Sequence, residues 1–356
     1  MKRTITAVIL TIASLISTSV SADGERPDKS RIVPALNKAF DVLIAASRDD
    51  DPFIRANAIE SLQMIPGRVA PIVHRGLSDP EPVVRYAATV TIGALRIQGL
   101  APNVAQLRKD PSPSVRAASL YALKSLGHNV NISPLGQFLV RSDPNLRGNV
   151  AMLLTLLGNR SALPMLQTVA GTPMPRVSAE RIAVVRAQIA EAMARLGDQR
   201  AFESLRSGMY SQFPEVRVIA VTALGGLGDR KMERAMMNIV QDPSFEELQV
   251  AAAVALARIG NYMGETLCVQ FTHEDHSSVL RAEAAWALGW FMYEKSFDRV
   301  EQLLSDPQTQ VRVFAAASII RRALAAKQRG DLTTDKDTNV ANQNRRSFAP
   351  FPSRSR

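Results

Sequence analysis

An arginine recurs about every 31 residues along most of the chain, each time with the same kind of neighbours. The segments "DPEPVVRYAATVTIGAL" (79–95) and "DPSPSVRAASLYALKSL" (110–126) align without gaps. With the arginine as marker, nine copies follow at steps of 30, 31, 31, 39, 31, 32, 32 and 31 residues: Arg55, Arg85, Arg116, Arg147, Arg186, Arg217, Gln249, Arg281 and Arg312. Repetition at such a period is typical of stacked two-element units.

Three columns around the marker indicate that the unit contains a helix. The residue before the marker is aliphatic in every copy, and the residue seven positions after it is always apolar. The residue three positions after it is mostly small. These offsets lie on one helical face, and small residues there allow a neighbouring helix to approach closely.

A turn and a second helix precede each marked helix. Asp-Pro recurs at 51–52, 79–80, 110–111, 143–144, 242–243 and 306–307. Aspartate caps helix starts, and proline is tolerated in the first turn. Shorter amphipathic segments such as "VAPIVHRGL" lie upstream. Helix–turn–helix units of this kind bury their apolar faces only by stacking, which predicts an all-α repeat array.

The repeated pattern Asp-Pro-x-x-x-Val-Arg-x-x-Ala-x-x-Ala-Leu-Gly-x-Leu-Gly resembles HEAT repeats. Segments such as "VRVIAVTALGGLGDRK" and "AMARLGDQRAFESL" are most similar to the phycobilin-lyase type of HEAT-like repeat. The resemblance covers about residues 31–326. It implies a right-handed α-solenoid of about nine repeats, with the marked helices on the concave side, and says little about function.

The resemblance also implies ladders between a turn aspartate and the helix arginine of adjacent repeats. A structural pair is needed in every copy, whereas a catalytic group is needed once, so the recurrence favours a structural role. Glu180, Ser211 and Gln249 interrupt the pattern. The ladder residues are Asp49, Arg55, Asp79, Arg85, Asp110, Arg116, Asp275, Arg281, Asp306 and Arg312.

The first residues have the features of a secretory signal peptide. Lys2 and Arg3 precede an apolar run from Ile5 to Ile16, and small residues end at Ala22. We expect cleavage after Ala22, with residues 23–30 as a linker. The net charge of +10 would then fall to +8, because Lys2 and Arg3 are lost. The predicted location is periplasmic or extracellular, with no membrane span after cleavage; an uncleaved anchor is the alternative, although the run is short for a bilayer.

The end of the chain, residues 327–356, lacks an apolar period and is predicted to be a disordered basic tail. Four arginines cluster there with two phenylalanines: Arg345, Arg346, Phe348, Phe351, Arg354 and Arg356. Such a tail either keeps the protein soluble or tethers it to an anionic envelope surface or an acidic partner.

Both tryptophans fall on one predicted stripe of the concave side. Positions five and nine residues after the marker are expected to point away from the core face. They place Trp286 and Trp290 together, with Arg258 and Arg321 at equivalent positions in the flanking repeats and Tyr293 nearby. These residue types are enriched at binding hot spots, which predicts a partner site. The alternative is ordinary packing, since "AEAAWALG" is a common form of this repeat.

Two further segments leave alternatives open. The His273-Glu274-Asp275-His276 cluster could bind a metal, or it could be only the turn of its repeat, where Asp275 stands six residues before Arg281. The long step of 39 residues contains an insertion near "GTPMPRVS" (171–178), whose prolines forbid a simple helix extension. That segment is either a tolerated surface loop or a binding loop or hinge.

A protein-interaction scaffold is the leading functional interpretation, with a protein or peptide on the concave face. No Ser/His/Asp set, P-loop, dinucleotide loop or HExxH motif occurs, so neither an enzyme nor a cofactor is expected. Nucleic acid is not favoured, because lysine and arginine do not line the stripe evenly. The alternatives are polyanion or envelope binding through the tail and arginines, and a lyase-like or pigment-binding role. The single cysteine, Cys268, excludes an intramolecular disulfide.

Overall fold

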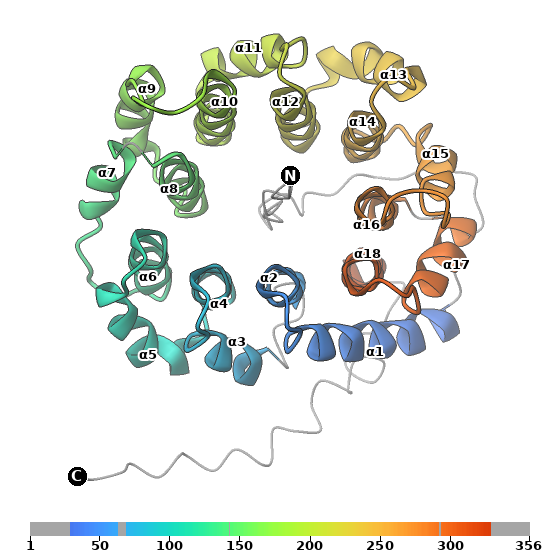
Figure 1. Ribbon diagram of the computed structural model, residues 1–356, viewed down its shortest axis with the longest axis horizontal. Coiled ribbons are helices and arrows are strands. Elements are labelled where there is room, and N and C mark those ends of the chain that lie inside the picture. The colour runs from blue at the N-terminus through green and yellow to red at the C-terminus, as the bar shows by residue number, and fades with distance from the viewer. Residues whose placement is uncertain (1–28, 63–68, 142, 292, 329–356) are drawn as a thin grey trace.

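The structure, a computed structural model, describes residues 29–62, 69–141, 143–291 and 293–328. Their helices form two concentric layers (Figure 1). The outer layer is α1 (Lys29–Ala46), α3 (Ala70–Gly76), α5 (Ala101–Gln106), α7 (Pro134–Leu139), α9 (Leu163–Gly171), α11 (Gln199–Gly208), α13 (Glu233–Gln241), α15 (Glu265–Gln270) and α17 (Glu294–Leu303). The inner layer is α2 (Pro52–Ser61), α4 (Pro82–Leu95), α6 (Pro113–Ser125), α8 (Pro144–Leu156), α10 (Ala179–Arg195), α12 (Pro214–Leu227), α14 (Glu246–Arg258), α16 (Ser278–Ala287) and α18 (Thr309–Gln328).

The marked helices are the inner layer, and the array closes on itself. Each inner helix packs against the inner helices before and after it, and α18 packs against both α1 and α2 (Figure 1). The sequence predicted a solenoid, whose first and last repeats would be its two ends. In the structure these repeats are neighbours, so the nine helix pairs form a ring.

Charged side chains reinforce the seam where the ring closes. Arg31 of α1 donates to three carboxylates of α17, with N···O distances of 3.1 Å to Glu294, 2.6 Å to Asp298 and 2.9 Å to Glu301. Its guanidinium also lies over the Phe297 ring, 5.3 Å from the centroid. A further contact joins Lys38 Nζ to Ser305 Oγ at 3.0 Å.

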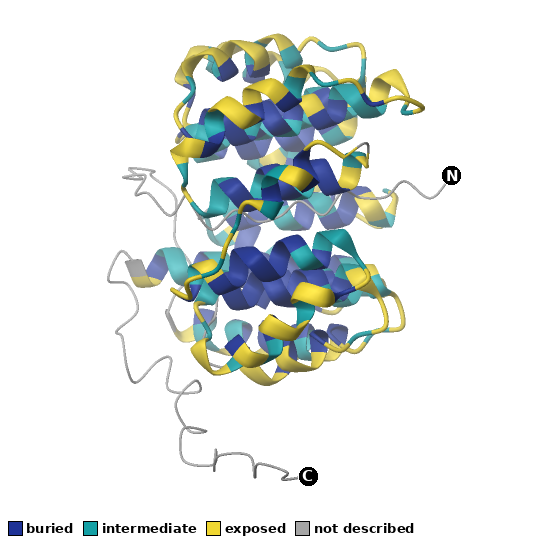
Figure 2. Ribbon diagram, turned by 90° about the vertical axis from the view of Figure 1, so that its left-hand side faces the viewer, coloured by how far each residue is buried: buried dark blue, intermediate teal, exposed yellow. Residues whose placement is uncertain are grey.

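The core lies between the two layers, where the sequence columns predicted it. Seen from the side, buried residues line the helix faces between the layers and exposed residues gather on loops and outer helices (Figure 2). The column three residues after the marker is at most 1 % exposed in every copy: Ala58, Ala88, Ser119, Val150, Ile189, Ala220, Ala252, Ala284 and Ala315. The full burial of this column confirms the register of the repeats.

Small residues set the spacing between the layers. A Cβ added to Gly76 of α3 would lie 2.9 Å from the Cβ of Ala88 on α4. At the equivalent place, a Cβ on Gly208 of α11 would lie 3.1 Å from that of Ala220 on α12. A larger residue on either side would push the outer helix away and open the core.

The Asp-Pro turns fall into two structural types. Asp51 and Asp143 cap the next helix, each accepting a backbone N–H two residues on, and the proline is the first helical residue. Elsewhere the aspartate lies about three residues before the helix and accepts the N–H two positions on without capping the helix, as in Asp79, Asp110 and Asp306. The expectation of one capping role for the motif was therefore too simple.

The described helices run from Lys29 to Gln328 and contain the predicted solenoid, residues 31–326. The predicted signal peptide (1–22) and tail (327–356) lie, apart from Lys327 and Gln328, outside the described residues, as does most of the linker (23–30). Of the helices that the structure describes, none combines the length and apolar character needed to cross a membrane.

Reversing the charge at the seam should weaken the ring. Arg31→Glu would place a fourth carboxylate among Glu294, Asp298 and Glu301, and we expect it to lower the free energy of unfolding by about 1–3 kcal/mol. Urea unfolding followed by circular dichroism measures this loss. Arg48→Glu is the matched control, because Arg48 is exposed just beyond α1. Equal losses in the two variants would contradict the seam's contribution.

Candidate functional site

The turn aspartates and marker arginines join adjacent repeats in one direction. Arg55 forks onto Asp79 of the next repeat, with Nε···Oδ2 of 2.9 Å and Nη2···Oδ1 of 2.8 Å. Arg85 binds Asp110 in the same way at 2.7 and 2.9 Å, and Arg281 Nη2 reaches Asp306 at 3.0 Å. These pairs are largely buried, and two N–H bonds per carboxylate make the first two strong and directional.

Each ladder arginine also stabilises its own turn. The Nη1 group of Arg85 donates to the carbonyls of Asp79 and Pro80, both at 2.9 Å. Arg55, Arg116 and Arg312 donate in the same way to two carbonyls of their own turns. One side chain therefore satisfies carbonyls before its own helix and, where the next repeat supplies an aspartate, ties the two repeats together.

Four members of the predicted ladder make no ion pair between repeats among the described residues: Asp49, Arg116, Asp275 and Arg312. Among the residues that the structure describes, Arg116 meets no carboxylate, since Arg141 occupies the equivalent place in the next repeat. The Arg116 guanidinium lies 5.7 Å from the Phe138 ring centroid instead. Asp275 is exposed and makes no ion pair with a described residue, because Gln249 replaces the arginine that would reach it. Gln249 Nε2 donates to the Val240 carbonyl at 2.8 Å.

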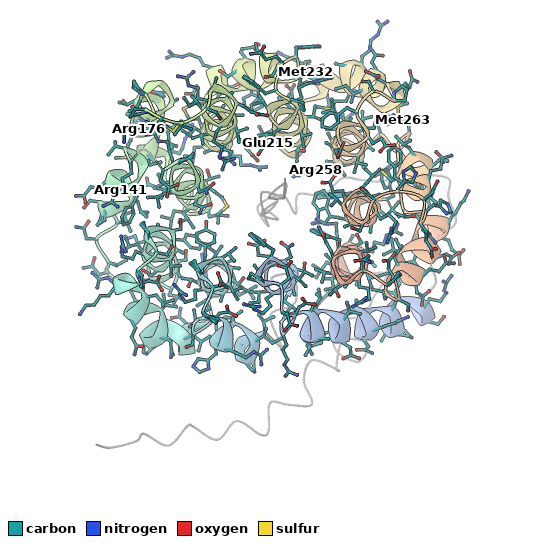
Figure 3. The ribbon with its side chains drawn as sticks, viewed as in Figure 1. Arg141, Arg176, Glu215, Met232, Arg258 and Met263 are labelled. Carbon is teal, nitrogen blue, oxygen red and sulfur yellow. The ribbon has the colours of Figure 1, made fainter. Side chains whose placement is uncertain are left out.

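The insertion at 171–178 packs onto the ring. Met174 is 4 % exposed, and the carbonyl of Thr172 accepts a hydrogen bond of 3.2 Å from the marker arginine Arg147. Arg147 is 1 % exposed, and burial lowers its pKa. Arg176, at the tip, has φ of 64° and lies on the periphery (Figure 3). The segment thus caps a buried arginine that has no aspartate partner.

The histidine cluster does not assemble a metal site among the described residues. No group of three or more His, Cys, Asp or Glu side chains with suitable spacing occurs there. His276 packs edge-on against Phe271, with ring centroids 5.2 Å apart, and its Nδ1 lies 3.9 Å from Glu246. The His276 carbonyl accepts from Arg281 at 3.1 Å, so this turn plays the part that Asp-Pro turns play elsewhere.

The expectation that positions five and nine after the marker share one open stripe is only half right. Position five is buried in five of the nine copies: Glu60, Val90, Tyr121, Val254 and Ala317. Position nine is half-buried in every described copy, and we call this set the inner row: Ala94, Ser125, Leu156, Arg195, Gly226, Arg258, Trp290 and Arg321. The difference arises because each inner helix is flanked by two inner neighbours, which cover position five.

The predicted tryptophans and arginines come together: Trp290, Arg258 and Arg321 on the inner row and Trp286 beside them. The Trp290 ring lies between two guanidiniums, 4.7 Å from Arg258 and 4.0 Å from Arg321. Trp286 packs edge-on against Trp290 with centroids 6.2 Å apart, and Arg321 also lies 5.8 Å from its centroid. Figure 3 shows Arg258 on the side of α14 that faces the centre of the ring. Three neighbouring repeats thus build one cation–π cluster.

The fifth predicted residue, Tyr293, lies elsewhere. Its ring packs edge-on against Tyr262 at 6.0 Å, and it precedes α17 in the outer layer. The path of the chain explains this placement: α16 ends at Ala287, and a tight 3₁₀ turn, η8 (Leu288–Trp290), redirects the backbone. Proximity in sequence therefore did not give proximity in space.

Arg195 and Gly226, which lie on the predicted stripe but outside the predicted partner site, extend the cluster. Arg195 pairs with Glu191, with N···O distances of 2.8 and 2.9 Å. A Cβ added at Gly226 would lie 2.9 Å from Nη2 of both Arg195 and Arg258. The sequence does indicate the arginines, since Arg195, Arg258 and Arg321 occupy the same repeat position. It does not indicate a role for Gly226, because glycine has no side chain to suggest one.

Arg322, which the sequence did not indicate, holds the cluster in place from behind. It is 3 % exposed and donates to the Leu288 carbonyl at 2.8 and 3.1 Å, to the Tyr293 carbonyl at 3.1 Å and to Ser296 Oγ at 2.5 Å. These bonds fix η8 against α18 and so orient Trp290.

Cys268 is fully buried, and burial raises the pKa of its thiol, so it is not poised as a nucleophile.

Burial and like charge shape the electrostatics of the inner layer. Burial, with repulsion from Arg195, lowers the pKa of Arg258 to about 10, and burial with repulsion from Arg258 lowers that of Arg321 to about 9. Both remain cationic at neutral pH. On α2, which packs against α18, burial alone raises the pKa of Glu60 to about 8.

A family model of HEAT repeats matches residues 69–141, 132–212 and 234–321, more than half of the sequence. The chain belongs to the HEAT repeat family. No curated protein matches it in sequence.

Solved structures show limited similarity. The complex of CpcE and CpcF of phycocyanin lyase from a Nostoc species is 18% identical, with a TM-score of 0.39 and coverage of 68% of this chain and 91% of that chain. Human deoxyhypusine hydroxylase is 17% identical with a TM-score of 0.36, covering 73% and 98%. Kap121p bound to Nup53p is 16% identical with a TM-score of 0.35, covering 85% and 40%.

The ladder makes a sharp prediction about stability. Arg85→Ala would leave Asp110 buried without its partner, and we expect a loss of about 3 kcal/mol in the free energy of unfolding. Arg116→Ala is the matched control, since Arg116 hydrogen-bonds only its own turn and contacts the next repeat only through the Phe138 ring, and about 1 kcal/mol should be lost. Denaturant unfolding of both variants measures the difference. Equal losses would show that the pairs between repeats add nothing.

The raised pKa of Glu60 predicts a pH dependence. Between about pH 4.5 and pH 8 the folded chain keeps a proton that the unfolded chain releases, so Glu60 makes stability fall as pH rises through this window. Glu60→Gln should remove up to about 1.4 kcal/mol of this fall per pH unit. Urea unfolding at pH 5 and pH 8 tests it, with the exposed Glu274→Gln as control. Parallel pH profiles for wild type and Glu60→Gln would refute it.

Proposed function

We propose that the protein is an exported, non-enzymatic scaffold that binds a protein or peptide partner on the inner layer of its ring. The observation that carries the proposal is the cluster of Trp290, Arg258 and Arg321 on the inner row with the adjacent Trp286. Tryptophan and arginine supply most of the energy at binding hot spots, where a large rigid ring and a forked cation meet a partner together.

The half-buried state of this cluster supports the proposal. A tryptophan needed only for packing would sit wholly between helices, as Phe291 and Phe297 do at 0 % exposure. Trp286 and Trp290 instead keep part of their surface open, and Arg322 holds Trp290's turn rigidly from behind. A rigid, partly open aromatic surface loses little entropy when a partner covers it.

Export supports the choice of partner class. The predicted signal peptide would carry the chain away from DNA and from cytoplasmic pigment proteins, which leaves envelope or extracellular proteins as candidates. The signal itself lies outside the described residues, and N-terminal sequencing of the protein from the envelope fraction would test cleavage after Ala22.

Site-specific photo-cross-linking tests the binding face. A photoreactive residue at Ser125 or Leu156, both on the inner row, should capture the same partner from a cell-envelope extract. The outer positions Tyr210 and Arg234, which are exposed, serve as controls and should capture nothing in common. Adding Trp290→Ala and Arg321→Ala should abolish the adduct, because the hot spot is lost. Adducts confined to outer positions would contradict the proposal.

A further inference from the structure

Five consecutive repeats place an alternating set of residues along the inner row. We call it the arginine arc: Arg195, Gly226, Arg258, Trp290 and Arg321. Arginines occupy the first, third and fifth places, a glycine the second and a tryptophan the fourth. The other half of the row is apolar or uncharged, with Ala94, Ser125 and Leu156.

The glycine brings two guanidiniums together. Nη2 of Arg195 and Nη2 of Arg258 each lie 2.9 Å from the point where a Gly226 Cβ would be, and Arg258 Nη2 also lies 3.4 Å from the Gly226 carbonyl. Any side chain at this position would separate them. The space above Gly226 is thus flanked by cationic groups from α10 and α14.

The tryptophan links the second and third arginines. Trp290 is contacted by Arg258 and by Arg321, so its indole side chain holds both guanidinium planes in place. No carboxylate of the described residues lies within ion-pair distance of Arg321. The indole N–H of Trp290 likewise has no acceptor among the described residues.

The charges of the arc are held closer together than their surroundings favour. Burial and repulsion from Arg195, opposed by Glu191, lower the pKa of Arg258, and burial and repulsion from Arg258 lower that of Arg321. Glu191, paired with Arg195, shows that a carboxylate fits against this surface. An incoming anion would relieve the repulsion and would gain from the low-dielectric surroundings.

We propose that the arginine arc binds an acidic peptide segment, with carboxylates at the paired guanidiniums above Gly226 and beside Arg321, and with apolar residues against the tryptophans. This inference rests on the proposed function and names its partner chemistry. A peptide fits better than a polyphosphate or a nucleic acid, because the cations alternate with an aromatic ring and a glycine and are followed by an apolar half-row.

Tryptophan fluorescence provides a local readout, since the chain's two tryptophans both lie in the cluster. Titration of the full chain with a synthetic peptide of alternating glutamate and leucine should give a saturable change that weakens with salt. A peptide with glutamine in place of glutamate should bind at least roughly tenfold more weakly. Equal binding of both peptides would overturn the inference.

Variants separate charge from geometry. Arg321→Met should weaken binding of the acidic peptide roughly tenfold, and Arg321→Lys should recover only part of it, because lysine lacks the planar fork. Gly226→Ala changes no charge but would push the guanidiniums apart, and it should weaken binding as well. The controls are Arg234→Ala on the outer layer and Gly99→Ala, where an added Cβ meets nothing within 4 Å. Thermal melts verify that every variant is folded.

The outcomes distinguish a failure of this inference from a failure of the proposed scaffold function on which it rests. If inner-row cross-links appear but the acidic peptide does not bind, the scaffold stands and the acidic partner is wrong. If Gly226→Ala and Arg321→Met bind the peptide as wild type does, the arc is not the site. If inorganic polyphosphate or a DNA oligonucleotide binds and the acidic peptide does not, the chemistry of the partner is other than proposed.

Discussion

The contact between α1 and α18 decides the character of this molecule, because it turns an array with two ends into a ring. In an open solenoid the terminal repeats expose one side to water and need polar caps. Here the first and last repeats cover each other, and Arg31 adds ion pairs across the seam to α17. Ring closure also means that every inner helix has an inner neighbour on both sides.

Inner neighbours on both sides, which sequential stacking supplies to α4 through α16 and ring closure to α2 and α18, explain what the inner layer offers a partner. Position five of the repeat is mostly buried between helices, so position nine is the surface that remains. The ladder of Asp–Arg pairs acts at another place, in the turns, and it is present in only part of the ring. Apolar burial supplies most of the stability, since the core columns are buried in nearly every repeat. The aspartate–arginine pairs, in contrast, occur in only some of the repeats.

Much of the fold could be predicted from the sequence, because a repeated local pattern reports a repeated local environment. The marker and its three columns gave the register, the helices and the core, and the Trp286–Trp290 cluster followed from the same register. Contacts that depend on accumulated geometry could not be predicted. Ring closure joins residues more than 260 positions apart, such as Arg31 and Glu294, and it results from the summed curvature of all repeats.

The candidate site shows the same division. Arg258 and Arg321 could be placed from their equivalent positions, but Tyr293 could not, because the 3₁₀ turn η8 redirects the chain after Trp290. The role of Gly226 could not be predicted for a different reason. Its contribution is the absence of a side chain, which lets Arg195 and Arg258 approach. Sequence patterns reveal residues that act by what they carry more readily than residues that act by the space they leave.

The closure of the ring by α1 and α18 can be tested by one direct measurement. Spin labels at positions 38 and 305, in a Cys268→Ala background, would report the distance across the seam by pulsed electron paramagnetic resonance. Lys38 and Ser305 are exposed, 267 residues apart in sequence and in contact at 3.0 Å. The closed ring predicts a single narrow distribution at short distance. A broad distribution at long distance would show an open solenoid and contradict the account.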